Sequence, residues 1–328
     1  MAQIVLGLGT SHTPMLNAAL EDWLHNFASI DPNRVHRDKN GRQVGYDALL
    51  RQADPRAESW RDATIMTDRY RRAQDALRHL SETLADARLD SLIVIGDDQD
   101  ELLHADNQPA FLIFWGESMP NTPRHRGRGL PPWYEQAMGG YFDDPARDYP
   151  VDAALARHLI ESLNAQDFDV AAANAVHGEH GEGHAYGFVH RRLMNSAALP
   201  IVPVFLNTYY PPNQPSPDRC YRMGQAIARA VATFPDDRRV GVVASGGLSH
   251  FTVDEELDAS VIEALRRKDG ETLRRLPVEK LEAGSSEIRN WICAAGALER
   301  LDVAWTEYVP GYRSDAGTGT GICFAVWH

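Results

Sequence analysis

The sequence predicts an α/β fold in which a mostly buried central sheet is flanked by helices. Short apolar runs rich in β-branched residues alternate along the chain with segments whose apolar residues recur at helical spacing. Such alternation is typical of layered α/β domains. Polar residues with acid, base or ligand chemistry follow most of the apolar runs, as expected where strands end at a functional edge.

The expected strands are short apolar runs without strict alternation, which indicates burial on both faces of a sheet. Glycine, proline or polar residues bound most of them. In chain order they cover residues 4–9, 92–96, 110–115, 169–173, 201–206, 240–244 and 320–326.

The expected helices carry apolar residues three or four positions apart. In the longest, over residues 60–87, Ala73, Leu77 and Leu80 fall on one face. The others cover residues 153–163, 186–194, 219–233, 259–267 and 286–300.

We expect one catalytic domain over residues 1–328. Average domain size favours about two domains for this length, but α/β folds of this size often form one. Two segments look inserted: residues 22–56 are polar, and residues 119–149 are rich in Pro, Gly, Arg and aromatic side chains. Such excursions serve either as lids and binding loops or as surface decoration and oligomer contacts.

The composition excludes several functions. Lys and Arg number 33 against 46 Asp and Glu, a formal net charge of −13, so we expect no nucleic-acid binding, which needs a basic footprint. The three cysteines are far apart and indicate neither a disulfide framework nor a zinc knuckle. No stretch approaches the roughly 20 apolar residues of a membrane span, and residues 1–8 lack a signal-like start. We therefore expect a cytoplasmic protein with no membrane partner.

The segments after the expected strands carry the chemistry. In open α/β sheets, ligands bind beyond the carboxyl ends of the strands, so we expect these segments to form a catalytic edge. They are residues 10–14 (Thr-Ser-His-Thr-Pro), 97–101 (Asp-Asp-Gln-Asp-Glu), 177–184, 207–212 and 245–250 (Ser-Gly-Gly-Leu-Ser-His).

Two histidines stand closely behind strands. His12 is held between a serine and a Thr-Pro pair, a placement that suits metal ligation or catalysis as well as a plain hydrogen-bonded role. His250 closes a turn that contains two glycines, where it suits general acid–base work because imidazole titrates near neutrality. The alternative for His250 is a cap for the following helix, a role that Ser249 or Thr252 can also fill.

A histidine-rich loop and a helix start add further ligand types. His177, His180 and His184 lie among glycines, so the segment is a loop, and we expect one of the three to line the pocket. Glu287 follows two serines in the first turn of an expected helix, where a Glu also stabilises the helix dipole.

In their order along the chain, these segments resemble class III (LigB-type) extradiol ring-cleavage dioxygenases, the family of the protocatechuate 4,5-dioxygenase β-subunit. Gly-Gly-Leu-Ser-His and the N-terminal Ser-His-x-Pro are the most specific parts. The resemblance implies a LigB-like catalytic domain and covers most of the chain outside the two insertions. It rests on residues 11–14, 98–99, 184, 205–207, 210–212, 219–234, 245–250 and 286–291.

The resemblance implies an Fe(II) centre of two histidines and one carboxylate, with positions left open for a catechol and O2. By position, His12 corresponds to the first histidine ligand and Glu287 to the carboxylate. His250 corresponds to the acid–base histidine, and His184 to a histidine that binds a substrate hydroxyl.

The partners implied are a small phenolic substrate and O2, and because family members are commonly oligomeric we expect a homo-oligomer. We expect Asn207 and Tyr210 to contact the substrate as well. The basic run at residues 124–128 (Arg-His-Arg-Gly-Arg) suits either a substrate carboxylate or a solvated loop.

Gln99 departs from the family pattern. It stands where the second metal-binding histidine is expected, and the spacing to Pro109 needs no gap. Three outcomes stay open: Gln99 ligates the metal through its amide oxygen, the site prefers a harder ion such as Mn(II), or the site holds no metal. His104, a few residues on, is a conceivable substitute ligand.

Two other functions follow from the last outcome. A His250 pocket without metal suits a non-oxidative hydrolase or lyase that acts on a phenol. A catalytically inactive member would bind an aromatic ligand or serve as the partner of an active subunit, although an inactive site has no chemical reason to keep His12, His250 and Glu287. We expect the metal-dependent dioxygenase.

Overall fold

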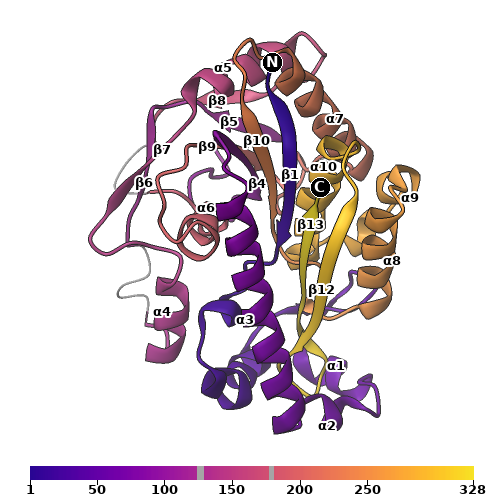
Figure 1. Ribbon diagram of the computed structural model, residues 1–328. Coiled ribbons are helices and arrows are strands. Elements are labelled where there is room, and N and C mark those ends of the chain that lie inside the picture. Colours follow the sequence, from indigo (N-terminus) through magenta and orange to yellow (C-terminus); the bar gives the residue numbers. More distant parts are fainter. Residues whose placement is uncertain (124–128, 177–180) are drawn as a thin grey trace.

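The computed structural model describes residues 1–123, 129–176 and 181–328. A nine-stranded mixed sheet forms its centre, with helices on both faces (Figure 1), which confirms the predicted fold class. The strand path is β11–β13–β1–β10–β4–β9–β5–β8, and β12 pairs with β13. The strands are β1 (Gln3–Thr10), β4 (Ser91–Asp97), β5 (Phe111–Phe114), β8 (Ala171–Ala173), β9 (Ile201–Leu206), β10 (Arg239–Ser245), β11 (His250–Thr252), β12 (Val303–Tyr312) and β13 (Thr318–Trp327).

All seven predicted strands are present, and β11 and β12 were not predicted. Strand β12 escapes the apolar pattern because it is only partly buried and contains Pro310. It pairs along one side only, with β13, and a proline is tolerated in such a strand.

The middle of the sheet is parallel. Strands β1, β10, β4 and β9 pair in the same direction, whereas β13 and β5 join them antiparallel. The carboxyl ends of the four parallel strands therefore lie at one edge of the sheet.

Both faces of this sheet are buried, which explains the unbroken apolar runs. In β4, Ile93 and Ile95 face one core while Leu92 and Val94 face the other. The first core lies under α5 (Ala153–Asn164), α7 (Pro217–Thr233), α8 (Glu255–Arg266), α9 (Gly270–Arg274) and α10 (Ile288–Ala297). The second lies under α3 (Ala63–Asp86), α4 (Pro132–Gly139) and α6 (His184–Phe188).

Helix α10 approaches the sheet closely at a glycine of β1. A Cβ atom at Gly9 would lie 2.3 Å from the ring of Trp291, so only glycine allows this contact. The close packing brings the start of α10, and with it Glu287, toward the end of β1.

The two inserted segments contain short helices and strands. Residues 22–56 contain η2 (Asp22–Asn26), η3 (Phe27–Asn33), β2 (His36–Arg37), β3 (Gln43–Val44) and α1 (Tyr46–Arg51). Residues 119–149 contain most of β6 (Ser118–Asn121), α4 and the start of β7 (Arg147–Pro150). The remaining short elements are η1 (Pro14–Asn17), α2 (Ala57–Trp60), η4 (Val189–Leu193), η5 (Val278–Lys280) and η6 (Ala283–Glu287). In the described part of the chain, no helix is both long and apolar enough to cross a membrane.

Candidate functional site

The site lies where three adjacent parallel strands end. His12 follows β1 by two residues, Asp97 is the last residue of β4, and Gly247 follows β10 by two. Glu287 joins them from the end of η6, directly before α10, and His184 from the start of α6. Three of the five predicted segments, residues 10–14, 97–101 and 245–250, therefore meet here, and His184 joins them from a fourth.

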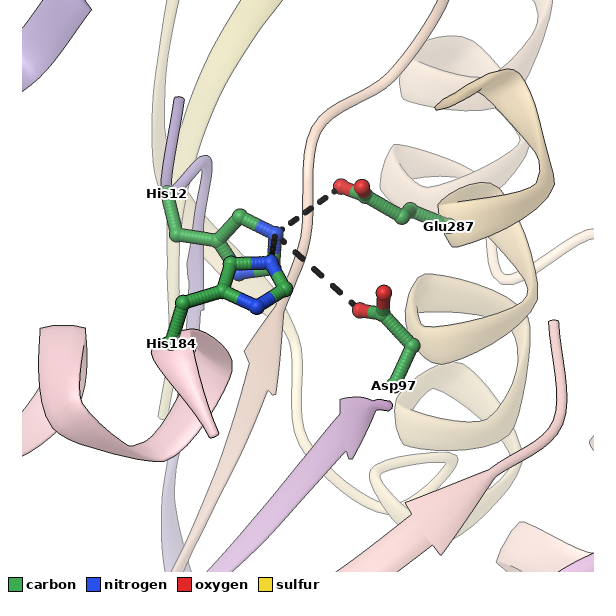
Figure 2. Close-up of side chains that lie close together, drawn as sticks. All are labelled: His12, Asp97, His184 and Glu287. Carbon is green, nitrogen blue, oxygen red and sulfur yellow. Dashed lines mark hydrogen bonds and ion pairs between the residues drawn. The ribbon is translucent and has the colours of Figure 1, made fainter. Parts of the chain in front are cut away.

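The ring of His12 is held in one tautomer. The Ser245 hydroxyl lies 3.1 Å from His12 Nδ1 and donates its single hydrogen to the Ala185 carbonyl, 2.7 Å away. It must therefore accept a hydrogen bond from the N–H at Nδ1. A neutral His12 thus keeps a lone pair on Nε2, which faces the other side chains of the site (Figure 2).

His184 is held by the carboxylate of Glu101. Its Nδ1 lies 2.7 Å from Glu101 Oε2, and its backbone N–H donates to both carboxylate oxygens. The loop that carries Glu101 is held by Asp98, whose carboxylate accepts hydrogen bonds from the backbone N–H groups of residues 101–103. The Nε2 atom of His184 then lies 3.2 Å from His12 Nε2. A carboxylate behind one ring nitrogen is the usual support of a metal-binding histidine.

Glu287 contacts four neighbours through its two oxygens. Oε2 accepts the Gly247 N–H at 2.7 Å and lies 3.2 Å from His12 Nε2. Oε1 lies 3.0 Å from Gln99 Nε2 and 3.1 Å from His250 Nε2. Burial alone would raise the pKa of Glu287, but the His250 and His12 imidazoles hold it well below its usual range.

Four side chains from separate elements gather donor atoms around one point (Figure 2). One atom from each of His12, Asp97, His184 and Glu287 lies within 4.8 Å of the others. Two imidazoles and two carboxylates suit Fe(II), Mn(II) or Zn(II). The residues present therefore fit a divalent metal ion.

The charge balance of this group is that of a cation site. Burial opposes a charge on His184, but Glu101, Asp97 and Glu287 together raise the pKa of this histidine to about 10. Burial, followed by repulsion from Glu287, raises the pKa of Asp97. Both shifts result from carboxylates that lie close together in a buried part of the site.

Gln99 enters the site as a hydrogen-bond donor. Its amide nitrogen lies 3.1 Å from Asp97 Oδ2 and 3.0 Å from Glu287 Oε1. The amide NH2 group therefore bridges two carboxylates that would otherwise repel each other.

His250 stands beside the four donors with its ring fixed on two sides. Its Nδ1 lies 2.8 Å from the Leu248 carbonyl and its Nε2 faces Glu287. The hydroxyl of Ser285 bonds both the backbone N–H and the carbonyl of His250 at 2.9 Å. A Cβ atom at Gly284 would lie 2.0 Å from His250 Cδ2, so the ring packs directly on this glycine. Burial opposes a charge on His250, but Glu287 outweighs it and raises the pKa.

A cavity of about 470 Å³ opens onto this group. Both inserted segments contribute to its wall. Residues 22–56 supply Phe27, Arg34 and Val35, and residues 119–149 supply Tyr134, Met138 and Tyr141.

The cavity is lined by five of the expected site residues: His12, Gln99, His184, His250 and Glu287. Asn207 and Tyr210 are not among its lining residues. The amide of Asn207 bonds the backbone N–H and carbonyl of Tyr210 at 3.0 and 2.8 Å and so shapes a turn. His104 is half-exposed and pairs with Asp100. The basic run at 124–128, His177 and His180 lie outside the described residues.

Asp97 and Glu101 were missed as functional residues by the sequence reasoning. Both belong to the acidic segment 97–101 directly after a strand, and that density of carboxylates was the available signal. Arg34 gave no signal at all, because it lies in a polar insertion far from the motifs.

A mixed sheet whose strand ends hold two histidines and two carboxylates beside a cavity is an arrangement that suits a metal-dependent α/β enzyme. Residues 62–321 match the family described as the catalytic LigB subunit of aromatic ring-opening dioxygenase. The chain belongs to this family, which confirms the resemblance seen in the sequence.

Several curated relatives share part of this chain. Gallate dioxygenase from Pseudomonas putida is 30% identical over 167 residues, 46% of this chain and 48% of that protein. The 2,3-dihydroxyphenylpropionate/2,3-dihydroxicinnamic acid 1,2-dioxygenase from Cupriavidus necator is 35% identical over 132 residues, 39% of each chain. Its namesake from Mycolicibacterium smegmatis is 36% identical over 101 residues, 31% of this chain and 30% of that protein. The chain thus spans less than half the length of these relatives.

Proposed function

We propose that this chain opens the ring of a catechol-type phenol with O2, as an extradiol-type dioxygenase. The observation that carries the proposal is His250, fixed beside a four-donor group within one cavity. The family and the names of the partial relatives support it. One catechol and one O2 give one ring-opened product that keeps both oxygen atoms, so no outside reductant is needed.

A divalent ion fits this site, with Fe(II) favoured by the family resemblance and Mn(II) as the alternative that oxygen donors suit. His12, Asp97, His184 and Glu287 would hold it. When bound, the ion supplies a common binding point for the catechol and O2 and lowers the pKa of a bound hydroxyl.

His250 is the residue placed to move the substrate proton. The Leu248 carbonyl keeps a hydrogen on Nδ1, so a neutral ring presents the lone pair of Nε2. That nitrogen takes a proton from a catechol hydroxyl, and Glu287, 3.1 Å away, stabilises the imidazolium. The proton then returns to the product through the same atom.

The charges of the cavity wall favour a substrate with an acidic substituent. The guanidinium of Arg34 donates to the Tyr134 hydroxyl at 3.2 Å and lies over that ring. Within the described chain, no carboxylate forms an ion pair with Arg34. Arg313, the other arginine of the wall, is paired with the buried Asp31. Among the described residues that line the cavity, Arg34 is thus the guanidinium left to meet an anion.

Oxygen uptake tests the proposed function. The protein is loaded with Fe(II) without air, mixed with catechols and gallates, and then exposed to O2. We expect stoichiometric uptake and a yellow ring-opened product. Turnover without O2 would instead establish the hydrolase or lyase alternative, and tight metal binding with no turnover on any substrate would establish the inactive binding protein.

A further inference from the structure

We propose that His184 and Asp97 complete the metal-binding set with His12 and Glu287, and that Gln99 positions the two carboxylates without binding the metal. The inference rests on the proposed function, in that it assigns the ligands of the same site. It replaces the expected ligand at position 99 with two residues from other positions.

The orientation of the Gln99 amide places its nitrogen, and not its oxygen, next to the carboxylates of Asp97 and Glu287. Its terminal amide faces Asp97 Oδ2 at 3.1 Å and Glu287 Oε1 at 3.0 Å. If the amide were turned round, its oxygen would face two carboxylate oxygens with no hydrogen between them, which is repulsive. The nitrogen must therefore occupy this position, and an amide NH2 group cannot ligate a metal ion.

The Nε2 atoms of the two imidazoles point at the same space. Ser245 takes the hydrogen of His12 Nδ1, and Glu101 takes that of His184 Nδ1. The two Nε2 atoms nevertheless lie 3.2 Å apart, with Glu287 Oε2 3.2 Å from the one on His12. Without an ion, one of the two Nε2 atoms must carry a hydrogen for this contact to be favourable, and a bound cation would take the place of that hydrogen.

The spacing of the donor atoms suits one ion. Donors bound to the same ion at roughly 2.1 Å lie about 3.0 to 4.3 Å apart. The distances from His12 Nε2 are 3.2 Å to His184 Nε2, 3.2 Å to Glu287 Oε2 and 4.0 Å to Asp97 Oδ1.

The surrounding residues hold these donors in place. Asn290 donates to Asp97 Oδ1 at 3.1 Å, and the Gly247 N–H donates to Glu287. Two carboxylates balance the charge of a divalent ion. If His184 is a ligand, it does not bind the substrate hydroxyl. Of the three histidines His12, His184 and His250, only His250 then remains for proton transfer.

Nitrogen hyperfine spectroscopy on the Mn(II)-loaded, full-length protein tests the assignment without turnover. We expect two coordinated imidazoles in the wild type, one in His184→Ala, and still two in Gln99→Met. A wild-type spectrum with a single imidazole would overturn the proposal. The number of imidazoles in the wild-type spectrum decides this outcome, so the test stands even if a variant fails to fold.

Metal affinity, measured by competition with a chromophoric chelator, gives a second readout. We expect Asp97→Asn and His184→Ala to weaken Mn(II) binding by about 10- to 100-fold and Gln99→Met by only a few-fold. His104→Ala, on the loop that follows β4, is the matched control and should leave affinity unchanged. A loss in Gln99→Met as large as in His12→Ala, with His184→Ala unchanged, would make Gln99 the ligand. Neither readout depends on oxygen uptake, so failure of ring cleavage and failure of this assignment are separate results.

Discussion

The proposed metal-binding edge (His12, Asp97, His184 and Glu287) and the wall from residues 22–56 face the same cavity but are built in opposite ways. At the edge, each donor is fixed by a second partner: Ser245 behind His12, Glu101 behind His184, and Gly247 on Glu287. In the wall, Arg34 bonds the hydroxyl of Tyr134, lies over that ring and lines the cavity.

This difference indicates which part of the cavity suits chemistry and which part suits recognition of the substrate. Proton transfer and metal binding need atoms held to within about half an ångström, and supporting hydrogen bonds provide that. A substituent far from the reacting atoms needs only a complementary charge. The wall also lies outside residues 62–321, which match the family, so it is free to vary with the substrate.

The largest effect is expected from His250→Ala. Loss of the group that moves the proton should lower kcat by about 100- to 10,000-fold, while Mn(II) affinity stays unchanged because His250 is not in the donor set. Steady-state oxygen uptake and chelator competition measure the two. A variant with wild-type kcat would show that His250 is not the acid–base group.

Gly284→Ala tests how precisely that ring must lie. A methyl group here would meet His250 Cδ2 at 2.0 Å, so the ring must move. A displacement near 1 Å lowers turnover by about 10- to 100-fold with metal still bound. Gly139→Ala is the matched control, because a Cβ atom there meets nothing within 4 Å. Equal activity in both variants would mean that turnover tolerates a displaced His250 ring.

Arg34→Gln tests the wall. We expect KM for gallate to rise about tenfold, with kcat and the KM for its uncharged methyl ester little changed. Arg51→Gln, an exposed change in the same insertion, is the control. Binding of gallate to the metal-free protein, followed by calorimetry, gives the same comparison without catalysis. An equal effect on acid and ester would show that Arg34 does not select charge.

The sequence predicted the edge far better than the wall. His12, His250 and Glu287 could be found because short motifs place them directly behind strands or at a helix start. Arg34 could not be found, because its role depends on how an insertion folds back over the cavity. Asn207 and Tyr210 lie in a strand-end segment too, but their hydrogen bonds to each other form a turn. Local sequence indicates that a strand end is polar, whereas tertiary packing decides which of its side chains face the cavity.

The smallest effect concerns Asp258, whose burial beneath the edge is expected to reduce stability. It accepts hydrogen bonds from the backbone and hydroxyl of Ser249, next to His250, and from the Tyr308 hydroxyl. Burial raises the pKa of Asp258 to about 6, although these hydrogen bonds oppose the rise. The unfolded chain therefore loses this proton at lower pH than the folded chain does, so the contribution of Asp258 to stability falls as pH rises through about 6.

Asp258→Asn removes that titration. Relative to the variant, the wild type should lose roughly 1 to 2 kcal/mol of unfolding free energy between about pH 5 and about pH 7.5. Urea unfolding of both proteins at the two pH values measures the change, and any constant cost of the substitution cancels. A gap between the two proteins that does not vary with pH would show that Asp258 titrates alike in the folded and unfolded chain. The proposed metal-binding edge would then lie next to a carboxylate that is ionised at neutral pH despite its burial.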